Sequence, residues 1–514
     1  MIRAWRNLSR LAAIARAFAR HGALRLVART PLGESLAVRA IGIVLGLAFG
    51  RSGTGAKRPG VQLAGALAEL GPCFVKFGQA LSIRSDLLGE EMAADLATLQ
   101  DRMPAFDGAA ARAIVEAELG APVEVLFRSF EPDAMAAASI AQVHRAVSAE
   151  GAFVAVKVLR PGVEVQFARD VDLMRWLAGL LDDWWPDMRR LRLPEVVQAF
   201  AETVALEMDL RMEGAAASEL AERFRGEARF RVPRIDWQRT AQRVLTLERV
   251  DGIPAGDLAA LRERGVDLRA LLETAASTFF VQVFRDGFFH ADMHPGNLFV
   301  EPPGTLVPVD FGIMGRLDLQ TRRYLAEMLI GFLSGDYRRV AEVHVRAGYV
   351  PPDTVVPLFA QACRSIAEPI LGRPLAEISF ARLLSQLFRV TQVFHMEAQP
   401  QLLLLQKTML QAEGMGRLLD PTINMWTLAQ PLVERWAAEN LGPAARARDL
   451  AADLLTGLSR LPAIFERLDS PAAPVGRPDD ARRERRGSRP QPPASPPAWW
   501  WLALAAAFLA GLAL

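Results

Sequence analysis

The chain has 514 residues, of which 51% are hydrophobic, so it is long enough for two or three domains and a substantial packed core. Its 60 Lys and Arg against 58 Asp and Glu give a net charge of +2, so nothing in the total suggests a nucleic-acid-binding protein with a large basic field. Cys73 and Cys363 lie far apart without CxxC spacing, which argues for a reducing compartment and against a disulfide framework or a cysteine zinc site.

The first 59 residues form a basic segment. Seven Arg and no acidic residue precede Glu34, and large apolar residues such as Trp5, Leu8 and Phe18 are interleaved with the Arg. This pattern predicts an amphipathic helix, which either lies on an anionic membrane surface or packs on the rest of the protein. We expect no secretory signal, because the first long apolar run is too short and lies too deep in the segment.

Residues 60–125 have helical periodicity, with breaks at Gly71-Pro72 and at Pro104. A short β region follows, in which the β-branched runs QVHRAV and AFVAVKVL, separated by SAEG, predict a hairpin. The second run carries Lys157 among apolar residues. An unpaired ammonium there would be costly, so Lys157 requires an acidic partner.

The rest of the chain alternates at first and is then mostly helical. Residues 194–225 and 255–289 are predicted helical, and the predicted strands are FRVPRI, RVLTLERV and the pair LFVE and LVPVDFG, which PPGT joins. From Leu317 to about Leu468 nearly every segment has helical periodicity. A small mixed part followed by a large helical part predicts a two-lobed α+β protein with a cleft between the lobes.

The C-terminal part differs in kind. Residues 470–497 are rich in Pro, Ala and Arg without apolar periodicity, which predicts an extended or disordered linker. Residues 498–514 carry no charge and have three Trp near their start, so they predict a membrane anchor with its aromatic rings at the headgroup level. The Arg residues of the linker keep the bulk of the protein on the cytoplasmic side. An apolar helix docked on the protein or on a second subunit is the alternative.

One short stretch, HADMHPGN from His290 to Asn297, concentrates polar side chains. His290 and His294, four residues apart around Asp292, resemble a metal site. Against this, Asp292 lies five residues before Asn297, and a DFG motif at Asp310 follows on the far side of a strand pair. In kinase-type phosphoryl transfer one Asp orients or deprotonates the acceptor, and an Asn and a second Asp hold Mg²⁺ on the phosphates. Mg²⁺ prefers oxygen ligands to imidazole, so we favour a nucleotide site in which both His are structural.

A kinase-type site also needs an acid that pairs with Lys157. The candidates are Glu207, Asp209 and Glu213 in LEMDLRMEG, and we expect Asp209 and Glu213 on one helix face. The glycine-rich phosphate loop that should precede Lys157 is replaced by AMAAASIAQVH, Ala134–His144. Because the Cβ of Ala blocks a close backbone approach, this loop should be stiffer and should bind phosphates differently. Typical protein-kinase activity is therefore less expected.

These motifs together resemble the UbiB family of atypical kinase-like proteins, which is linked to ubiquinone biosynthesis. FVKFGQALSIRSDLL, AAASIAQVH, VAVK, EMDLRMEG, FHADMHPGN and VDFG appear in the family's order. The resemblance implies a two-lobed α+β, protein-kinase-like fold with a family-specific N-terminal helical extension and a C-terminal transmembrane helix. Departures are small: Leu210 stands where an aromatic residue is frequent, Gly214 stands where Ala is frequent, and one apolar span is visible where bacterial relatives often have two.

The resemblance also assigns roles to residues of this sequence. Lys76 and Gln79 match the Lys-x-Gly-Gln signature, which folds across the cleft. Glu207 and Asp209 match a Glu-x-Asp motif near it, and Glu213 matches the helix Glu that pairs with Lys157. The expected catalytic residues are Asp292, Lys157, Lys76 and Gln79; the expected nucleotide-binding residues are Ala136, Ala137, Ala138, Ser139, Lys157, Glu207, Asp209, Glu213 and Glu248; the expected metal ligands are Asn297 and Asp310.

The function that the resemblance implies is an ATPase that uses ATP and Mg²⁺, responds to membranes and phenolic lipid, and supports ubiquinone biosynthesis by extracting or presenting isoprenoid precursors. The expected partners are the membrane, phenolic and isoprenoid lipid precursors, ubiquinone-biosynthesis enzymes and a second copy of the chain in a homodimer, but no nucleic acid. The expected location is the inner (cytoplasmic) membrane of a bacterium, with the catalytic domain in the cytoplasm. Two alternatives stay open: a small-molecule phosphotransferase of the aminoglycoside or choline kinase type, and a non-catalytic, nucleotide-gated lipid scaffold.

The expected domains follow from these assignments. In order they are the basic segment 1–59, the helical extension 60–125 with the Lys-x-Gly-Gln signature, the kinase-like N-lobe 126–252, the helical C-lobe 253–469, the linker 470–497 and the anchor 498–514.

Overall fold

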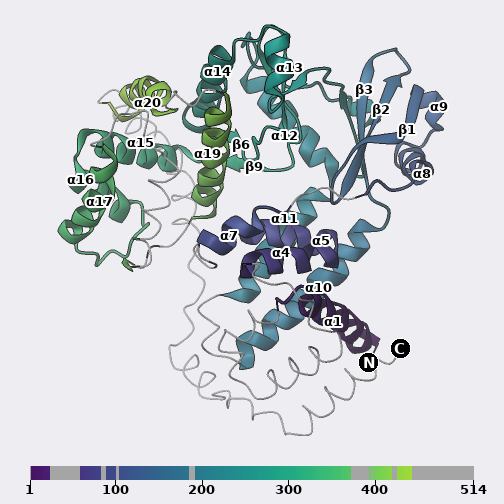
Figure 1. Ribbon diagram of the computed structural model, residues 1–514, viewed down its shortest axis with the longest axis horizontal. Helices are drawn as coiled ribbons and strands as arrows, with labels where there is room; N and C mark the ends of the chain where they lie inside the picture. Colours follow the sequence, from purple (N-terminus) through teal and green to yellow (C-terminus); the bar gives the residue numbers. More distant parts are fainter. Residues whose placement is uncertain are drawn as a thin grey trace, which may run out of the picture. The chain divides into compact units, whose positions relative to one another are not determined.

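The computed structural model describes residues 2–23, 58–82, 88, 90–99, 104–184, 192–371, 390, 393–394, 396, 399–419 and 425–442. The chain divides into two compact units, Met1–Glu434 and Arg435–Leu514, and every site residue discussed below lies in the first. That unit contains a helical group, a four-stranded sheet and a second, mostly helical part (Figure 1).

The helical group gathers segments from before and after the sheet in the sequence. It contains α1 (Ile2–Arg20), α4 (Pro59–Leu70), α5 (Pro72–Ser82), α7 (Glu90–Leu96), α10 (Val163–Trp184) and α11 (Leu193–Glu207). Their apolar faces share one core, in which Leu67, Phe74 and Phe167 are buried. Gly71 follows α4 with a φ of 99°, which favours glycine, and Pro72 begins α5, so the predicted break is confirmed.

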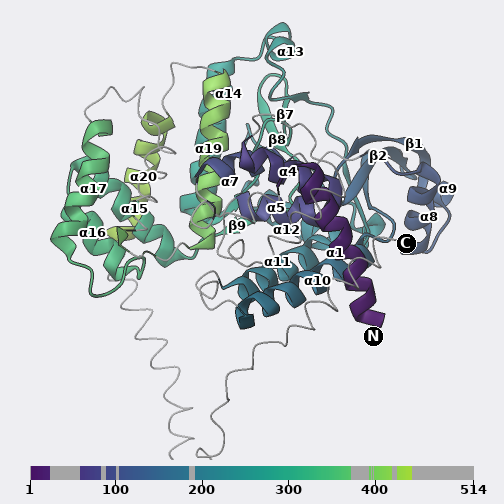
Figure 2. The ribbon, with the colours of Figure 1, turned by 60° about the horizontal axis from the view of Figure 1, so that its bottom comes forward.

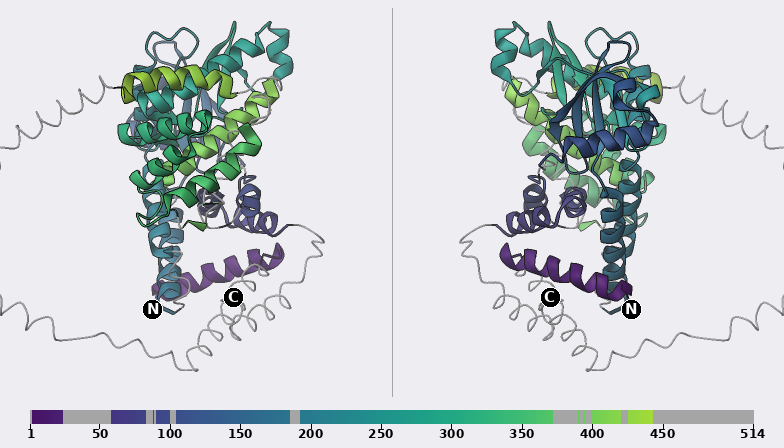
Figure 3. Two further views of the ribbon diagram at one scale, coloured as in Figure 1. Left: turned by 90° about the vertical axis from the view of Figure 1, so that its left-hand side faces the viewer. Right: turned by 90° about the vertical axis from the view of Figure 1, so that its right-hand side faces the viewer.

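Helix α1 packs on α4 (Figure 3). Ala12 and Ala17 are buried. Arg10 Nε donates to Oδ1 of Asp170 in α10, and Arg10 Nη2 donates to Oδ2, each at 2.8 Å. For residues 2–23, the structure shows the packed helix of the two alternatives, and contact of this helix with a membrane stays a prediction.

Four antiparallel strands form the sheet in the order β1-β2-β3-β4: β1 (Phe127–Ala137), β2 (Ala141–Ser148), β3 (Phe153–Leu159) and β4 (Val244–Glu248). Side chains alternate along β3, so Val154, Val156 and Val158 share one face of the sheet. These three pack with α8 (Gly108–Leu119) and α9 (Val123–Leu126). Lys157 and Leu159 take the opposite face, on which α12 (Leu210–Arg223) lies. The predicted β2–β3 hairpin is confirmed.

Two expectations for this region are wrong. Ala134–Ala137, expected in a loop, is the end of β1 and pairs with β2. The predicted strand FRVPRI does not form, and Phe230 and Ile235 make isolated bridges instead. Pro233 lies between them and has no N–H with which to continue a ladder.

The second part carries two small sheets and most of the remaining helices. The first sheet contains β5 (Ile253–Pro254), β7 (Leu298–Glu301) and β8 (Thr305–Pro308), and the second pairs β6 (Phe288–His290) with β9 (Met314–Arg316). The β7–β8 pair was predicted, whereas β9 was not. The helices are α13 (Leu258–Glu263), α14 (Leu268–Phe280), a π-helix (Val281–Asp286), α15 (Leu319–Ser334), α16 (Tyr337–Arg346), α17 (Val356–Leu371) and α19 (Pro400–Leu419). The boundary between the two units falls within α20 (Met425–Leu441). Helix α19 lies beside α14 (Figure 2).

None of the helices within the described ranges has both the length and the apolar character needed to span a bilayer. The predicted linker 470–497 and the predicted anchor 498–514 lie outside those ranges. Both therefore stay predictions.

Candidate active site

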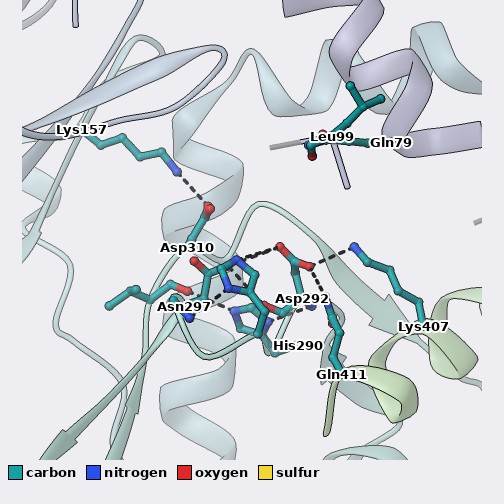
Figure 4. A network of polar contacts seen from close by, with 12 residues as sticks. Gln79, Leu99, Lys157, His290, Asp292, Asn297, Asp310, Lys407 and Gln411 are labelled. Carbon is teal, nitrogen blue, oxygen red and sulfur yellow. Dashed lines mark hydrogen bonds and ion pairs between the residues drawn. The ribbon is translucent and has the colours of Figure 1, made fainter. Parts of the chain in front are cut away.

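Lys157 lies in the middle of β3, on the sheet face that α12 covers. Its Nζ donates to both carboxylate oxygens of Glu213 at 2.9 Å. It also donates to Oδ1 of Asp310 at 2.9 Å (Figure 4). The Lys157 and Glu213 side chains are only 14% and 9% exposed. The acidic partner that the buried lysine requires is therefore Glu213, with Asp310 as a second.

Burial and proximity set the protonation of this triad. Burial alone would lower the pKa of Lys157, but the charges of Asp310 and Glu213 outweigh it and raise the pKa. The Lys157 charge lowers the pKa of Asp310 well below its usual range. Burial raises the pKa of Glu213, although Lys157 acts in the opposite direction. Lys157 is therefore a permanent cation and Asp310 a permanent anion at neutral pH.

The backbone at Asp310 directs its carboxylate toward Lys157. Asp310 adopts the left-handed conformation, with a φ of 63°. Among non-glycine residues, Asp and Asn tolerate this conformation best. The next residue, Phe311, is buried and its ring meets the His290 ring edge-on, with centroids 5.6 Å apart. The side chains of these two neighbours therefore differ in environment: the Asp310 carboxylate is 45% exposed, and the Phe311 ring lies in the core.

His290 ties together the loop that carries Asp292. Its Nδ1 accepts from the Asp292 N–H at 3.1 Å, so Nε2 bears the proton and donates to the Val309 carbonyl at 3.2 Å. Burial lowers the pKa of His290, which keeps the ring neutral. His294 Nδ1 accepts from the Gly296 N–H at 3.0 Å. Because both nitrogens of His290 are occupied, the alternative of a metal bound by His290 and His294 is not supported.

Asp292 and Asn297 are in contact. Asn297 Nδ2 donates to the Asp292 carbonyl oxygen at 3.2 Å and to Asp292 Oδ2 at 3.3 Å. Its amide oxygen is therefore the end left for a metal. One amide oxygen and one carboxylate, that of Asp310, suit Mg²⁺, which binds through one or two such groups together with phosphate oxygens. Among the described residues, no group of three or more His, Cys, Asp or Glu could hold a metal ion. A cation at this site would therefore need phosphate oxygens as further ligands.

Two residues that the sequence analysis did not select also reach Asp292. Lys407 Nζ and Gln411 Nε2, both from α19, donate to Asp292 Oδ1 at 2.9 Å each (Figure 4). Burial would raise the pKa of Asp292, but Lys407 and Gln411 outweigh it and the pKa is lowered. A usable signal was present in the sequence, because Lys407 is a single charge within the run LLLLQKTMLQ and lies four residues before Gln411.

A family model described as the ABC1 atypical kinase-like domain matches residues 98–344, and one described as the UbiB helical domain matches residues 363–424. The "Probable protein kinase UbiB" of Marinobacter nauticus is 48% identical to this chain over 407 residues, which cover 78% of this chain and 74% of the relative. The chain belongs to the UbiB family. This confirms both the resemblance and the kinase-like fold inferred from the motifs.

Further UbiB relatives give the same result. Proteins with the same printed name from Aeromonas hydrophila and Azotobacter vinelandii are 46% and 43% identical, over 75% and 83% of this chain and 72% and 80% of the relatives. Among solved structures, the complex of Rv3197 with erythromycin from Mycobacterium tuberculosis matches 72% of this chain and 94% of that chain, at 25% identity and a TM-score of 0.48.

The residues of the UbiB Lys-x-Gly-Gln signature lie on α5. Lys76 Nζ pairs with Glu207 Oε2 at 3.2 Å, and both side chains are nearly buried. The Lys76 charge also helps to lower the pKa of Asp310, so α5 is close to the Lys157 triad. Gln79 Nε2 donates to the Leu99 carbonyl oxygen at 3.2 Å, beyond α7 (Figure 4).

The Glu-x-Asp motif does not act as one unit. Helix α11 ends at Glu207 and α12 begins at Leu210, so the expectation that Asp209 and Glu213 share a helix face is wrong. Asp209 caps α12 by accepting from the Arg211 N–H, and its carboxylate also binds the Arg211 side chain at 2.7 Å. A short carboxylate favours such a cap, whereas a Glu is too long for it.

The other residues expected to bind nucleotide lie around the β1–β2 turn and at the end of β4. Ala136 and Ala137 belong to β1, and the buried Ser139 lies in the turn. Arg160 Nη2 donates to the Ala138 carbonyl oxygen at 2.9 Å, which fixes the turn and agrees with a stiff Ala-rich segment. Glu248 pairs with Arg231 at 3.1 Å. The roles of these residues stay predictions.

Proposed function

We propose that this UbiB protein is a membrane-anchored, Mg²⁺-dependent atypical kinase-like ATPase. It supports ubiquinone biosynthesis at the inner (cytoplasmic) membrane of a bacterium, by extracting or presenting phenolic and isoprenoid precursors. The observation that carries the proposal is the position of Lys157 between Glu213 and Asp310, next to the loop that carries Asp292 and Asn297.

Each residue then has a chemical task. Lys157, held by Glu213, contacts the phosphates, and Asp310 and Asn297 hold the cation. Mg²⁺, when bound, neutralises charge that develops on the phosphates. Asp292 accepts a hydrogen bond from the O–H of the acceptor. As the bond between the terminal phosphorus and the ADP oxygen breaks and a new phosphorus–oxygen bond forms, ADP leaves and the acceptor's proton passes through Asp292 to solvent.

Water suits this site as the acceptor. Lys76 on α5 lies close enough to Asp310 to lower its pKa, which supports a site that the helical extension covers. A bulky peptide would have to displace that extension, whereas water would not. The charge-free segment 498–514 and the hydrocarbon character of isoprenoids support a position at the bilayer.

Thermal unfolding of the purified full chain tests nucleotide binding. MgATP at about 100 times its Kd should stabilise the wild type by about 2.7 kcal/mol, and ATP without Mg²⁺ should stabilise it far less. Asp310→Asn should lose the MgATP effect. Asp353→Asn, which changes an exposed carboxylate in the loop before α17, is the matched control and should keep it.

A wild type whose midpoint does not move with MgATP contradicts the assignment. Complementation of a quinone-deficient strain separates turnover from a scaffold role. Asp292→Asn should fail to complement, and full complementation by this variant would favour a nucleotide-gated lipid scaffold.

A further inference from the structure

We propose that Lys407 and Gln411 are positioning residues for the Asp292 carboxylate, supplied to the kinase-like domain by the UbiB helical domain. The proposal rests on the proposed phosphoryl-transfer function. Residues 98–344 match the kinase-like model and residues 363–424 match the helical model, so these two side chains come from outside the domain that carries Asp292. Helix α19 reaches the site because it packs on α14 and on β9.

The two donors occupy one oxygen of Asp292. Lys407 Nζ and Gln411 Nε2 both lie 2.9 Å from Oδ1. A carboxylate oxygen offers two lone pairs, so Oδ1 is filled. Oδ2 accepts a hydrogen bond from Asn297 Nδ2 at 3.3 Å and lies 3.8 Å from His294 Nε2, which is too far for a hydrogen bond, so it keeps a lone pair for an acceptor O–H. The hydrogen bonds of Lys407 and Gln411 to Oδ1 therefore fix the rotation of the carboxylate and leave Oδ2 as the oxygen that meets the acceptor.

The amide of Gln411 supports this assignment. Among the described residues, its Oε1 is buried and has no hydrogen-bond partner. Burying a hydrogen-bond acceptor without a partner is unfavourable. Such acceptors are rare in protein cores unless another interaction of the same side chain offsets the cost. Turning the amide over would pair Oε1 with the Asp292 carboxylate, two acceptors facing each other. The contact of Nε2 with Asp292 thus determines the orientation of Gln411.

The composition of the chain gives an independent argument. Of its 60 Lys and Arg only four are Lys, namely Lys57, Lys76, Lys157 and Lys407, and the other 56 are Arg. Almost everywhere this sequence uses Arg when it needs a cation. Lys76, Lys157 and Lys407 pair with Glu207, Glu213 and Asp292 around one site. A compact ammonium with three rotatable donors fits where a planar guanidinium does not. Lys407 therefore belongs with the site lysines and not with the surface cations.

The test uses ATP hydrolysis by the full chain in phospholipid vesicles. Lys407→Met should lower kcat about tenfold to a hundredfold, with the KM for MgATP and the MgATP stabilisation within about twofold. Gln411→Ala should lower kcat by a smaller factor.

Lys407→Arg separates charge from shape. It keeps the cation, so its kcat should exceed that of Lys407→Met, but kcat should stay severalfold below the wild type because the guanidinium fits poorly. Arg417→Met is the matched control, since Arg417 lies on the same helix, is 62% exposed and pairs with Glu413, and it should leave kcat unchanged.

Several results would overturn the proposal. If Lys407→Met keeps the wild-type kcat, or if its kcat falls only together with the unfolding midpoint, the contact merely joins two domains. A wild type that binds MgATP but never hydrolyses it also overturns the positioning role. A wild type that does not bind MgATP refutes the proposed function instead, so the two failures are distinguishable.

Discussion

Replacing Lys157 with Met removes the ammonium that lies between Glu213 and Asp310 while keeping an unbranched side chain of similar length. Glu213 is 9% exposed and would become an uncompensated buried charge. Removing one partner of such a pair costs about 3–5 kcal/mol. Asp310 is 45% exposed, so water solvates it and it adds little to that cost. We therefore expect Lys157→Met to lower the free energy of unfolding by about 3–5 kcal/mol in the absence of nucleotide.

Removing the charge of the other partner, Glu213, should lower the free energy of unfolding by less. Glu213→Gln leaves Lys157 paired with Asp310 at 2.9 Å, so a loss of about 1–3 kcal/mol is expected. The double variant should lose less than the sum of the single losses, because Lys157→Met does little further harm once Glu213 is neutral. Arg338→Met is the control, since it breaks an exposed pair with Glu342 and should cost about 0.5 kcal/mol.

The pH dependence gives the sharper test. In Lys157→Met the pKa of Glu213 should lie further above its unfolded value of about 4.3, because burial and the Asp310 charge then act without the opposing charge of Lys157. The folded state then binds more protons than the unfolded state between these two pKa values. The free energy of unfolding of this variant should therefore rise as the pH falls from 8 to 5. Thermal midpoints at a fixed scan rate measure it. A variant with the wild-type midpoint and no gain on acidification would refute the idea that Glu213 is a buried carboxylate stabilised by Lys157.

Two further changes probe other buried charges. Arg10→Met should cost about 2–4 kcal/mol, because the Asp170 side chain is 3% exposed, and hydrogen exchange in α1 should speed up; an unchanged midpoint would mean that α1 is not anchored by this pair. Burial lowers the pKa of His344 to about 4, so the unfolded state binds more protons than the folded state between about pH 6.5 and 4, and stability falls as the pH falls through that window. In urea titrations at pH 7 and pH 4.5, His344→Gln should reduce the loss in free energy of unfolding between the two pH values by up to about 3 kcal/mol. An equal loss in the wild type and the variant would contradict it.

The part of the site that the sequence predicted depends on short-range geometry. Asp292 and Asn297 are five residues apart in one turn, and Asp310 follows after a single strand pair, so few arrangements of the backbone are available. The need of Lys157 for a partner followed from its apolar neighbours, which β3 confirms. These are local constraints, and periodicity and turn residues specify them well.

The features that were missed depend on packing between distant segments. Lys407 lies 115 residues from Asp292 and reaches it only because α19 packs beside α14. Asp209 was placed on a helix face, although a short carboxylate before a helical run is also an N-cap signal. Strand β9 has three residues and exists only because β6 lies next to it, so no local pattern distinguishes it from a turn.

The charges around the site explain why a bare nucleotide should bind poorly. Lys76, Lys157 and Lys407 give three positive charges, and the acids paired with them, Glu207, Glu213, Asp292 and Asp310, give four negative charges, so the network is at −1 when all are ionised. A triphosphate adds several negative charges to a site that has no positive excess. Binding then requires divalent cations that arrive with the nucleotide, and Asp310 and Asn297 offer the oxygen ligands for them. Each lysine comes from a different part of the chain, namely the helical extension, the sheet and the helical domain. A triphosphate that competes with the carboxylates for these ammonium groups would therefore act on all three parts at once. Its binding or release can then shift how the three parts pack on one another while each part keeps its own fold.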